Sequence, residues 1–269
     1  MTARPEFLNN SLIIGAHPDD ELLWFNAILH LVDEVAIVYR SFWAQPDLAE
    51  KRAKAIAAFP RDGVFCLDIE ESGAYGCANW ASPEENDVGL AFTLEWRKRE
   101  VKRAAKRALG SVGLPNLLVA RRSVLDAYRE NFELIRTRLR PRLRADMNVF
   151  THNPWGEYGH EEHVQVFRAL QSLQREIGFK LWMSNYCSER TLPLAMRYFQ
   201  TSPGGYIRLP TNKQFAEQVA QVYKDHQCWT WSDDWAWFDE ECYILAPDQG
   251  KEPEPQQHLL PLNMFTIAP

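Results

Sequence analysis

The chain has 269 residues, of which 46% are hydrophobic and 25% are charged, a composition that excludes a disordered protein. Its apolar runs are shorter than the roughly 20 residues that cross a bilayer, and residues 1–10 lack the apolar core of a signal peptide, so we expect a cytoplasmic protein. The formal net charge of −6 and the lack of a recognition module argue against nucleic-acid binding.

Short apolar runs alternate with segments of helical periodicity along the first half of the chain. The predicted elements are a strand at 11–16, a helix at 21–31, a strand at 34–39, a helix at 48–59 and a strand at 64–69. Strands that alternate with helices at this spacing indicate a parallel sheet covered on both faces. We therefore expect an α/β fold with a Rossmann-like start.

The remaining predicted elements extend this pattern toward the C-terminus. They are helices at 92–109 and 123–139, a strand at 147–151, a helix at 161–177, a strand at 179–184, a helix near 212–223 and a last strand at 241–245. Pro141 should end the second of these helices. We expect a mostly parallel sheet flanked by helices, with a C-terminal α/β extension. Ligands in such sheets bind beyond the carboxyl ends of strands, so the chemistry should follow the strands at 11–16 and 147–151.

Two polar loops lie at these places. The first contains His17, Asp19 and Asp20, and the second contains His160 and His163 at the start of a helix. A catalytic zinc takes three ligands from His and Asp or Glu and leaves a fourth position open for water, and these loops supply such a set. Of two adjacent aspartates, one can bind the metal while the other accepts a proton from water.

Each loop alone also fits a simpler interpretation. Acidic residues are common in the first turn of a helix, where they cap free N–H groups and oppose the helix dipole. Both the segment after Pro18 and the segment 160–163 have this composition. Their joint position, at the ends of two strands that should be neighbours, favours the metal site.

The two loops resemble the signatures of a known family. Residues 16–21 read AHPDDE, and residues 158–163 read YGHEEH. The first matches, and the second resembles, the AHPDDE and YGHxDH motifs of the PIG-L/LmbE family of zinc-dependent N-acetylglucosamine deacetylases. Members of this family act on glucosaminyl-phosphatidylinositol, on mycothiol and bacillithiol precursors and on antibiotic intermediates. The resemblance covers residues 11–69 and 147–177.

The resemblance implies one zinc ion per chain, with another divalent metal such as Fe²⁺ also compatible. The implied metal ligands are His17, Asp20 and His163. It further implies a single deacetylase domain over residues 1–269, in which residues 186–269 cap the substrate pocket.

The remaining implied roles concern catalysis and substrate binding. Asp19 is the implied general base, Tyr158 a donor to the tetrahedral intermediate, and His160 either the acid for the leaving amine or a group that helps hold the oxyanion. Arg52 and Glu71 stand where the family binds its substrate, although either residue also fits a solvent-exposed position.

The sequence departs from the family pattern at two places. Glu162 stands where the family usually has Asp; if this carboxylate orients His160, its longer reach shifts the ring. The family commonly follows its first motif with small residues, whereas this chain has LLWFN at 22–26. We therefore expect a differently packed first helix and a different substrate pocket.

Three functions remain open on the sequence. The leading one is a zinc-dependent hydrolase that removes the N-acetyl group from an N-acetylated amino sugar or its conjugate. The second is hydrolysis of another N-acyl or thiol-conjugate amide, and the third is a non-catalytic sugar-binding module. The substrate could be anionic, linked to a nucleotide or a lipid, and the sequence leaves homo-oligomerisation open.

Three further features have no assigned function. The tryptophans at 229, 231, 235 and 237 fit a saccharide platform, an amphipathic strand or a packing cluster. Residues 97–144 hold 15 Lys and Arg against 4 Asp and Glu, which fits an anionic substrate, a membrane surface or solvated helix faces. The five cysteines are scattered, without a CxxC pair, so we expect reduced thiols.

Overall fold

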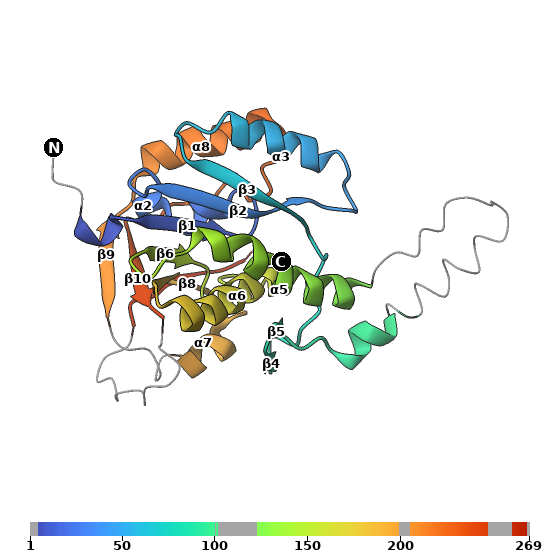
Figure 1. Cartoon of the computed structure of the whole chain (residues 1–269). Coiled ribbons are helices and arrows are strands. Elements are labelled where there is room, and N and C mark those ends of the chain that lie inside the picture. Colours follow the sequence, from blue (N-terminus) through green and yellow to red (C-terminus); the bar gives the residue numbers. More distant parts are fainter. Residues whose placement is uncertain (1–4, 100, 102–122, 199–204, 247–259, 268–269) are drawn as a thin grey trace.

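A seven-stranded sheet forms the centre of the computed structural model, which describes residues 5–99, 101, 123–198, 205–246 and 260–267 (Figure 1). The strand order is β3-β2-β1-β6-β7-β10-β9. The strands are β1 (Ser11–Gly15), β2 (Glu34–Ser41), β3 (Val64–Glu70), β6 (Asn148–Thr151), β7 (Lys180–Ser184), β9 (Tyr206–Pro210) and β10 (Glu240–Leu245). All pairings are parallel except those of β10, which runs antiparallel to both neighbours. The predicted α/β, Rossmann-like class is confirmed.

Helices cover both faces of this sheet. On one face lie α1 (Asp20–Leu23), α2 (Asn26–Leu29), α3 (Leu48–Ala57) and α8 (Lys213–Asp225), which contact one another. On the other lie α5 (Val124–Leu139) and α6 (Glu161–Ile177), which pack together (Figure 1). The smaller elements are η1 (Glu6–Leu8), η2 (Arg140–Arg142), α7 (Leu192–Tyr198), and the two-stranded pairs β4 (Glu85–Asn86) with β5 (Gly89–Leu90) and β8 (Tyr186–Ser188) with β11 (Asn263–Phe265).

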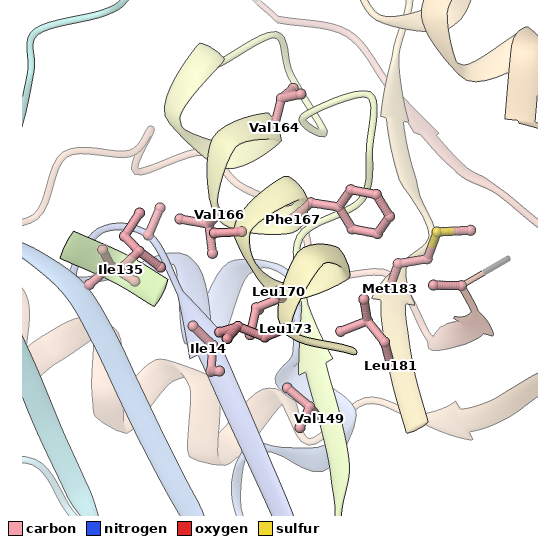
Figure 2. Packing of buried hydrophobic residues seen from close by; sticks show 14 of the residues in the cluster. Ile14, Ile135, Val149, Val164, Val166, Phe167, Leu170, Leu173, Leu181 and Met183 are labelled. Carbon is pink, nitrogen blue, oxygen red and sulfur yellow. The ribbon is translucent and has the colours of Figure 1, made fainter. Parts of the chain in front are cut away.

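The buried face of α6 anchors the helix whose first turn carries His163. Val166, Phe167, Leu170 and Leu173 recur at helical spacing and pack over the sheet, as Figure 2 shows. Each side chain is fully buried, which stabilises the fold by roughly 1.5–3 kcal/mol per residue. Gly178, with φ of 93°, ends the helix in the left-handed conformation. This rigid packing fixes the first turn of α6 against the ends of β1 and β6.

Most predicted elements are confirmed, with bounds shifted by a few residues, and α6 spans the predicted 161–177. The predicted helix at 21–31 is wrong: it is split into α1 and α2, because Phe25 (φ −136°, ψ 26°) leaves the helical conformation. Residues 94–99 are helical, whereas most of the predicted helix at 92–109 lies outside the described residues. The strand at 241–245 is not the last, since β11 follows it.

Three other expectations concern the chain as a whole. Within the described ranges, no helix combines the length and the apolar character needed to cross a membrane. All five cysteines are free, as predicted. Of the basic segment 97–144, residues 100 and 102–122 lie outside the described residues, and α5 accounts for much of the remainder.

Candidate metal centre

The two polar loops meet at one edge of the sheet, as predicted. Strands β1 and β6 are parallel neighbours, and Ile14 pairs with Thr151 at their carboxyl ends. The Thr151 hydroxyl donates a hydrogen bond to the Ile14 carbonyl at 2.9 Å. The loop that begins at Ala16 and the loop that begins at His152 therefore emerge side by side.

The three predicted metal ligands lie together and are buried. One potential ligand atom each of His17, Asp20 and His163 lies within 4.8 Å of the others. Asp20 Oδ2 is 3.3 Å from His17 Nδ1 and 3.3 Å from His163 Nε2. Atoms that coordinate a tetrahedral zinc at about 2.0–2.1 Å are themselves about 3.3 Å apart, so this spacing suits such an ion.

A missing hydrogen-bond partner indicates where a cation fits. His163 Nδ1 contacts Glu157 Oε2 at 2.8 Å, and this contact places the proton of the neutral ring on Nδ1. The lone pair of Nε2 then points toward Asp20, and this buried nitrogen has no hydrogen-bond partner. An unpaired buried polar atom is costly, and a cation bound at this nitrogen would remove that cost. The imidazole and carboxylate ligands of the site suit a divalent metal such as zinc.

Two further contacts hold Asp20. The Trp24 indole Nε1 donates to Asp20 Oδ1 at 2.8 Å, and the His17 backbone N–H donates to Oδ2 at 2.6 Å. Burial alone raises the pKa of the Asp20 carboxyl, but His163 and His152 outweigh it and hold this pKa well below its usual range. Asp20 is therefore a carboxylate with one oxygen fixed by Trp24 and the other facing the rings of His17, His152 and His163.

The carboxylate of Glu162 contacts His17 rather than His160. Glu162 Oε2 lies 3.0 Å from His17 Nε2, while Ser72 donates to Oε1 from its backbone N–H at 2.7 Å and its hydroxyl at 2.6 Å. The Glu162 carboxylate therefore does not orient the His160 ring in the way that the family pattern suggested, because its contact is with His17. Burial disfavours the His17 imidazolium, but Asp20 and Glu162 raise the pKa of this ring, so the surroundings of His17 attract positive charge.

Asp19 lies next to the ligand cluster in a strained backbone conformation, with φ of 108°. The Thr230 hydroxyl donates to Asp19 Oδ2 at 2.5 Å. Burial and the neighbouring Asp20 raise the pKa of the Asp19 carboxyl to about 7. A carboxyl with this pKa can both accept and release a proton near neutral pH.

His160 and Tyr158 border the cluster on the side of the second loop. His160 caps α6, with its Nδ1 accepting from the Glu162 backbone N–H at 3.2 Å, so the neutral ring carries its proton on Nε2. Desolvation and the neighbouring His17 and His163 lower the pKa of His160, which favours this neutral form. Burial raises the pKa of Tyr158 well above its usual value, so its hydroxyl stays protonated and can donate.

Arg52 and Glu71, the two predicted substrate-binding residues, pair with each other. A guanidinium nitrogen of Arg52 contacts Glu71 Oε1 and also donates to the Arg40 carbonyl at 3.2 Å. Both side chains line the pocket described below, and Arg52 Nε is buried without a hydrogen-bond partner. The solvent-exposed alternative is therefore wrong for Arg52, whose side chain is 4% exposed.

A cavity of about 760 Å³ opens above the ligand cluster. Its lining includes His17, Asp19 and Asp20, here called its floor, together with Tyr158 and His160. The C-terminal region contributes the residues Thr230, Trp231, Ser232, Asp234, Trp235, Thr266 and Ile267. Of the four clustered tryptophans, Trp231 and Trp235 line the cavity, and the segment 228–239 forms no strand.

Two residues outside the predicted metal ligands and catalytic residues, Glu157 and His152, support the site. Glu157 Oε2 contacts both His163 Nδ1 and His152 Nδ1, the latter at 3.1 Å. His152 Nε2 accepts from the Ala16 backbone N–H at 2.8 Å, so both ring nitrogens of His152 have hydrogen-bond partners. Glu157 lies in the turn that precedes α6, six residues before His163, so no helical or strand periodicity spans the pair and no local pattern could identify it.

Replacing Trp24 by Phe should weaken metal binding. The ring would remain in the core, whereas the donor to Asp20 Oδ1 would be lost. Loss of a hydrogen-bond donor to a metal ligand typically weakens metal affinity about 10- to 100-fold. Competition with a chromophoric zinc chelator measures this change. Trp182→Phe is the matched control, since its indole donates to Asn148 away from the cluster; equal affinity in the Trp24→Phe and wild-type proteins would contradict the assignment.

Replacing Gly156 by Ala should distort the second loop. Gly156 has φ of +67°, and a Cβ there would lie 2.9 Å from the His160 carbonyl oxygen and 3.0 Å from Val164 Cγ2. We expect a loss of about 1–3 kcal/mol in the free energy of unfolding and weaker zinc binding. Urea denaturation and chelator competition measure the two effects.

Gly178→Ala is the control for this substitution. Gly178 also has positive φ, but a Cβ there meets nothing within 4 Å. Gly178→Ala carries the same cost of an alanine at positive φ but places its Cβ against no other atom, so it should leave zinc affinity unchanged. If both variants lower zinc affinity equally, or neither does, the loop does not position the site as described.

Comparisons with known proteins give a distant structural likeness. No protein-family model matches the sequence, and no curated protein matches it either. Among solved structures, the chain is similar to a deacetylase–teicoplanin complex from the biosynthesis pathway of teicoplanin. The two share 12% identity with a TM-score of 0.48, over 90% of this chain and 99% of the other. The functional proposal therefore depends on the side chains of the site.

Proposed function

We propose that this protein is a zinc-dependent hydrolase that removes the N-acetyl group from an N-acetylated amino sugar or its conjugate. The observation that carries the proposal is the buried trio His17, Asp20 and His163, with the unpartnered His163 Nε2, directly beside the carboxyl of Asp19 on the floor of an open cavity. The similarity of residues 16–21 and 158–163 to the deacetylase motifs supports the same reaction.

Zinc held by His17, Asp20 and His163 would supply Lewis acidity and acidify a water molecule. Asp19 would accept the proton of the attacking water. As the tetrahedral intermediate collapses, the C–N bond breaks, and the protonated Asp19, with a pKa of about 7, can pass this proton to the leaving amine nitrogen. The products are the amine and acetic acid, which releases its proton to become acetate.

Tyr158 and His160 would stabilise the oxyanion of the intermediate. The Tyr158 hydroxyl keeps its proton, and neutral His160 carries a proton on Nε2, so each can donate a hydrogen bond. Loss of one such donor typically costs about 10²- to 10³-fold in rate. Of the two roles that the motif implies for His160, its lowered pKa supports the oxyanion role over that of a cationic acid.

Release of acetate tests the proposal. The protein is freed of metal, loaded with zinc and incubated with a panel of N-acetylhexosamines and their conjugates. Zinc-dependent acetate and amine from at least one member are the expected result. Release of a different acyl group would indicate another amide hydrolase, and sugar binding without metal or turnover would indicate a binding module; either outcome would overturn the proposal.

A further inference from the structure

The lining of the cavity above the ligand cluster includes a set of apolar side chains, here called the wall. This wall consists of Leu23, Phe42, Leu48, Trp231, Trp235 and Ile267. At about 760 Å³, the cavity lies in the upper part of the roughly 300–1,000 Å³ range of pockets that hold drug-sized ligands. A single N-acetylated sugar over the ligands would leave much of the wall uncovered.

The aromatic part of the wall is held in place by other rings. Trp231 lies edge-on to Trp24 with ring centroids 5.4 Å apart, and to Tyr158 at 5.0 Å. Trp235 packs edge-on against Trp231 at 5.6 Å and against Phe265 at 5.3 Å. Such contacts favour fixed ring orientations, so the wall offers a preformed surface for a flat apolar group.

The charges that line the cavity disfavour an anionic ligand. The lining carboxyl groups are Asp19, Asp20, Glu71, Glu162 and Asp234. Among the described lining residues, Arg52 is the one cationic Lys or Arg side chain, and it is paired with Glu71. A bound divalent ion would not make this lining positive. Phosphate groups are usually recognised by several Arg or Lys side chains or by free helix N-termini.

On the basis of the proposed function, we infer that the substrate is an uncharged conjugate of an N-acetylated amino sugar whose attached group is apolar or aromatic and lies on the Trp231–Trp235 wall. The sugar amide lies over the ligand cluster, and the attached group points away from it toward the wall. Phosphate-linked amino sugars are disfavoured, which narrows the substrate range that the sequence left open.

Three matched ligands test the inference: 4-nitrophenyl N-acetylglucosaminide in both anomers, free N-acetylglucosamine, and N-acetylglucosamine 1-phosphate. Amine release gives kcat/KM, and quenching of tryptophan fluorescence gives binding independently of turnover. We expect one anomer of the aryl conjugate to have a kcat/KM and an affinity about 10-fold or more above those of the free sugar. A tenfold change represents about 1.4 kcal/mol, and burial of an aromatic ring contributes at least this much. N-acetylglucosamine 1-phosphate should have a lower kcat/KM and a lower affinity than the free sugar.

Variants in the wall make the test specific. Trp231→Ala should lower kcat/KM for the aryl conjugate about 10-fold more than for the free sugar, mainly through KM, and Phe42→Ala, from the segment after β2, should act in the same direction. Trp237→Ala, in the same loop but not lining the cavity, is the control and should not change this ratio. Phe42→Ala keeps the test informative if the Trp231→Ala protein fails to fold.

The outcomes separate this inference from the proposed function. If the phosphate is bound and hydrolysed as well as the aryl conjugate, or the wall variants leave the ratio unchanged, the inference is wrong while the hydrolase stands. If no amine is released from any ligand but the aryl conjugate still binds in a Trp231-dependent way, the proposed hydrolysis fails while the binding preference stands.

Discussion

Asp19→Asn is expected to lower kcat about 10²- to 10⁴-fold while the protein still binds one zinc ion per chain. An amide in place of the carboxyl cannot accept the proton of the attacking water, and loss of a general base costs a factor in this range. The substitution conserves volume and leaves His17, Asp20 and His163 unchanged. The variant therefore separates proton transfer from metal binding, which are measured by amine release and by metal analysis.

The control for this variant is Asp233→Asn, in the loop that also holds Thr230. Asp233 contacts Lys224 at 2.6 Å and its side chain is 77% exposed, so its charge has no part in the cavity. This control should keep wild-type kcat and zinc content. An Asp19→Asn protein with full turnover would refute the general-base role, and one that loses its zinc would assign Asp19 to the metal instead.

His163→Ala should abolish stoichiometric zinc binding and reduce turnover by at least about 10³-fold. The substitution removes the buried nitrogen that lies 3.3 Å from Asp20 Oδ2 and has no hydrogen-bond partner. A metal ion contributes several kcal/mol to the stabilisation of charge in the transition state, and each 1.36 kcal/mol is a factor of ten in rate. Zinc content after dialysis and the rate of amine release measure both effects.

His30→Ala is the histidine control, because His30 is exposed and its ring packs 6.1 Å from Phe215, outside the ligand cluster. It should retain zinc and turnover. Because His163 is fully buried, the His163→Ala protein is also compared with the wild type by urea denaturation in the presence of a chelator. A folded His163→Ala protein that binds zinc as tightly as the wild type would exclude His163 as a ligand.

The parts of the fold that the sequence predicted well are those with strong local signals. The helix α6 has apolar residues at helical spacing and a glycine in the left-handed conformation at its C-terminal end, and its bounds were predicted to the residue. The split between α1 and α2 could not be predicted, since it arises where the Trp24 indole donates to Asp20 and Phe25 packs in the core. The edge strand β9 was missed because its residues are exposed or half-buried, so no apolar run marks it.

The candidate site likewise combines residues that a local motif predicts with residues that only the tertiary fold brings in. The positions of His17, Asp20 and His163 follow from two short motifs and from the pairing of β1 with β6. Thr230 lies 211 residues from Asp19, and Ser72 lies 90 residues from Glu162. Contacts at such separations depend on the tertiary fold, and neither residue stands in a motif, so no sequence pattern could connect the pairs.

Titration of the metal-free protein with zinc, while amine release from an N-acetylglucosaminide is followed, tests the central claim most directly. We predict that turnover is absent without metal, rises in proportion to added zinc and reaches its plateau at one ion per chain. Full turnover in the metal-free protein would contradict a metal-dependent hydrolase. So would a protein that binds one zinc ion at the trio and releases no amine from any N-acetylated amino sugar.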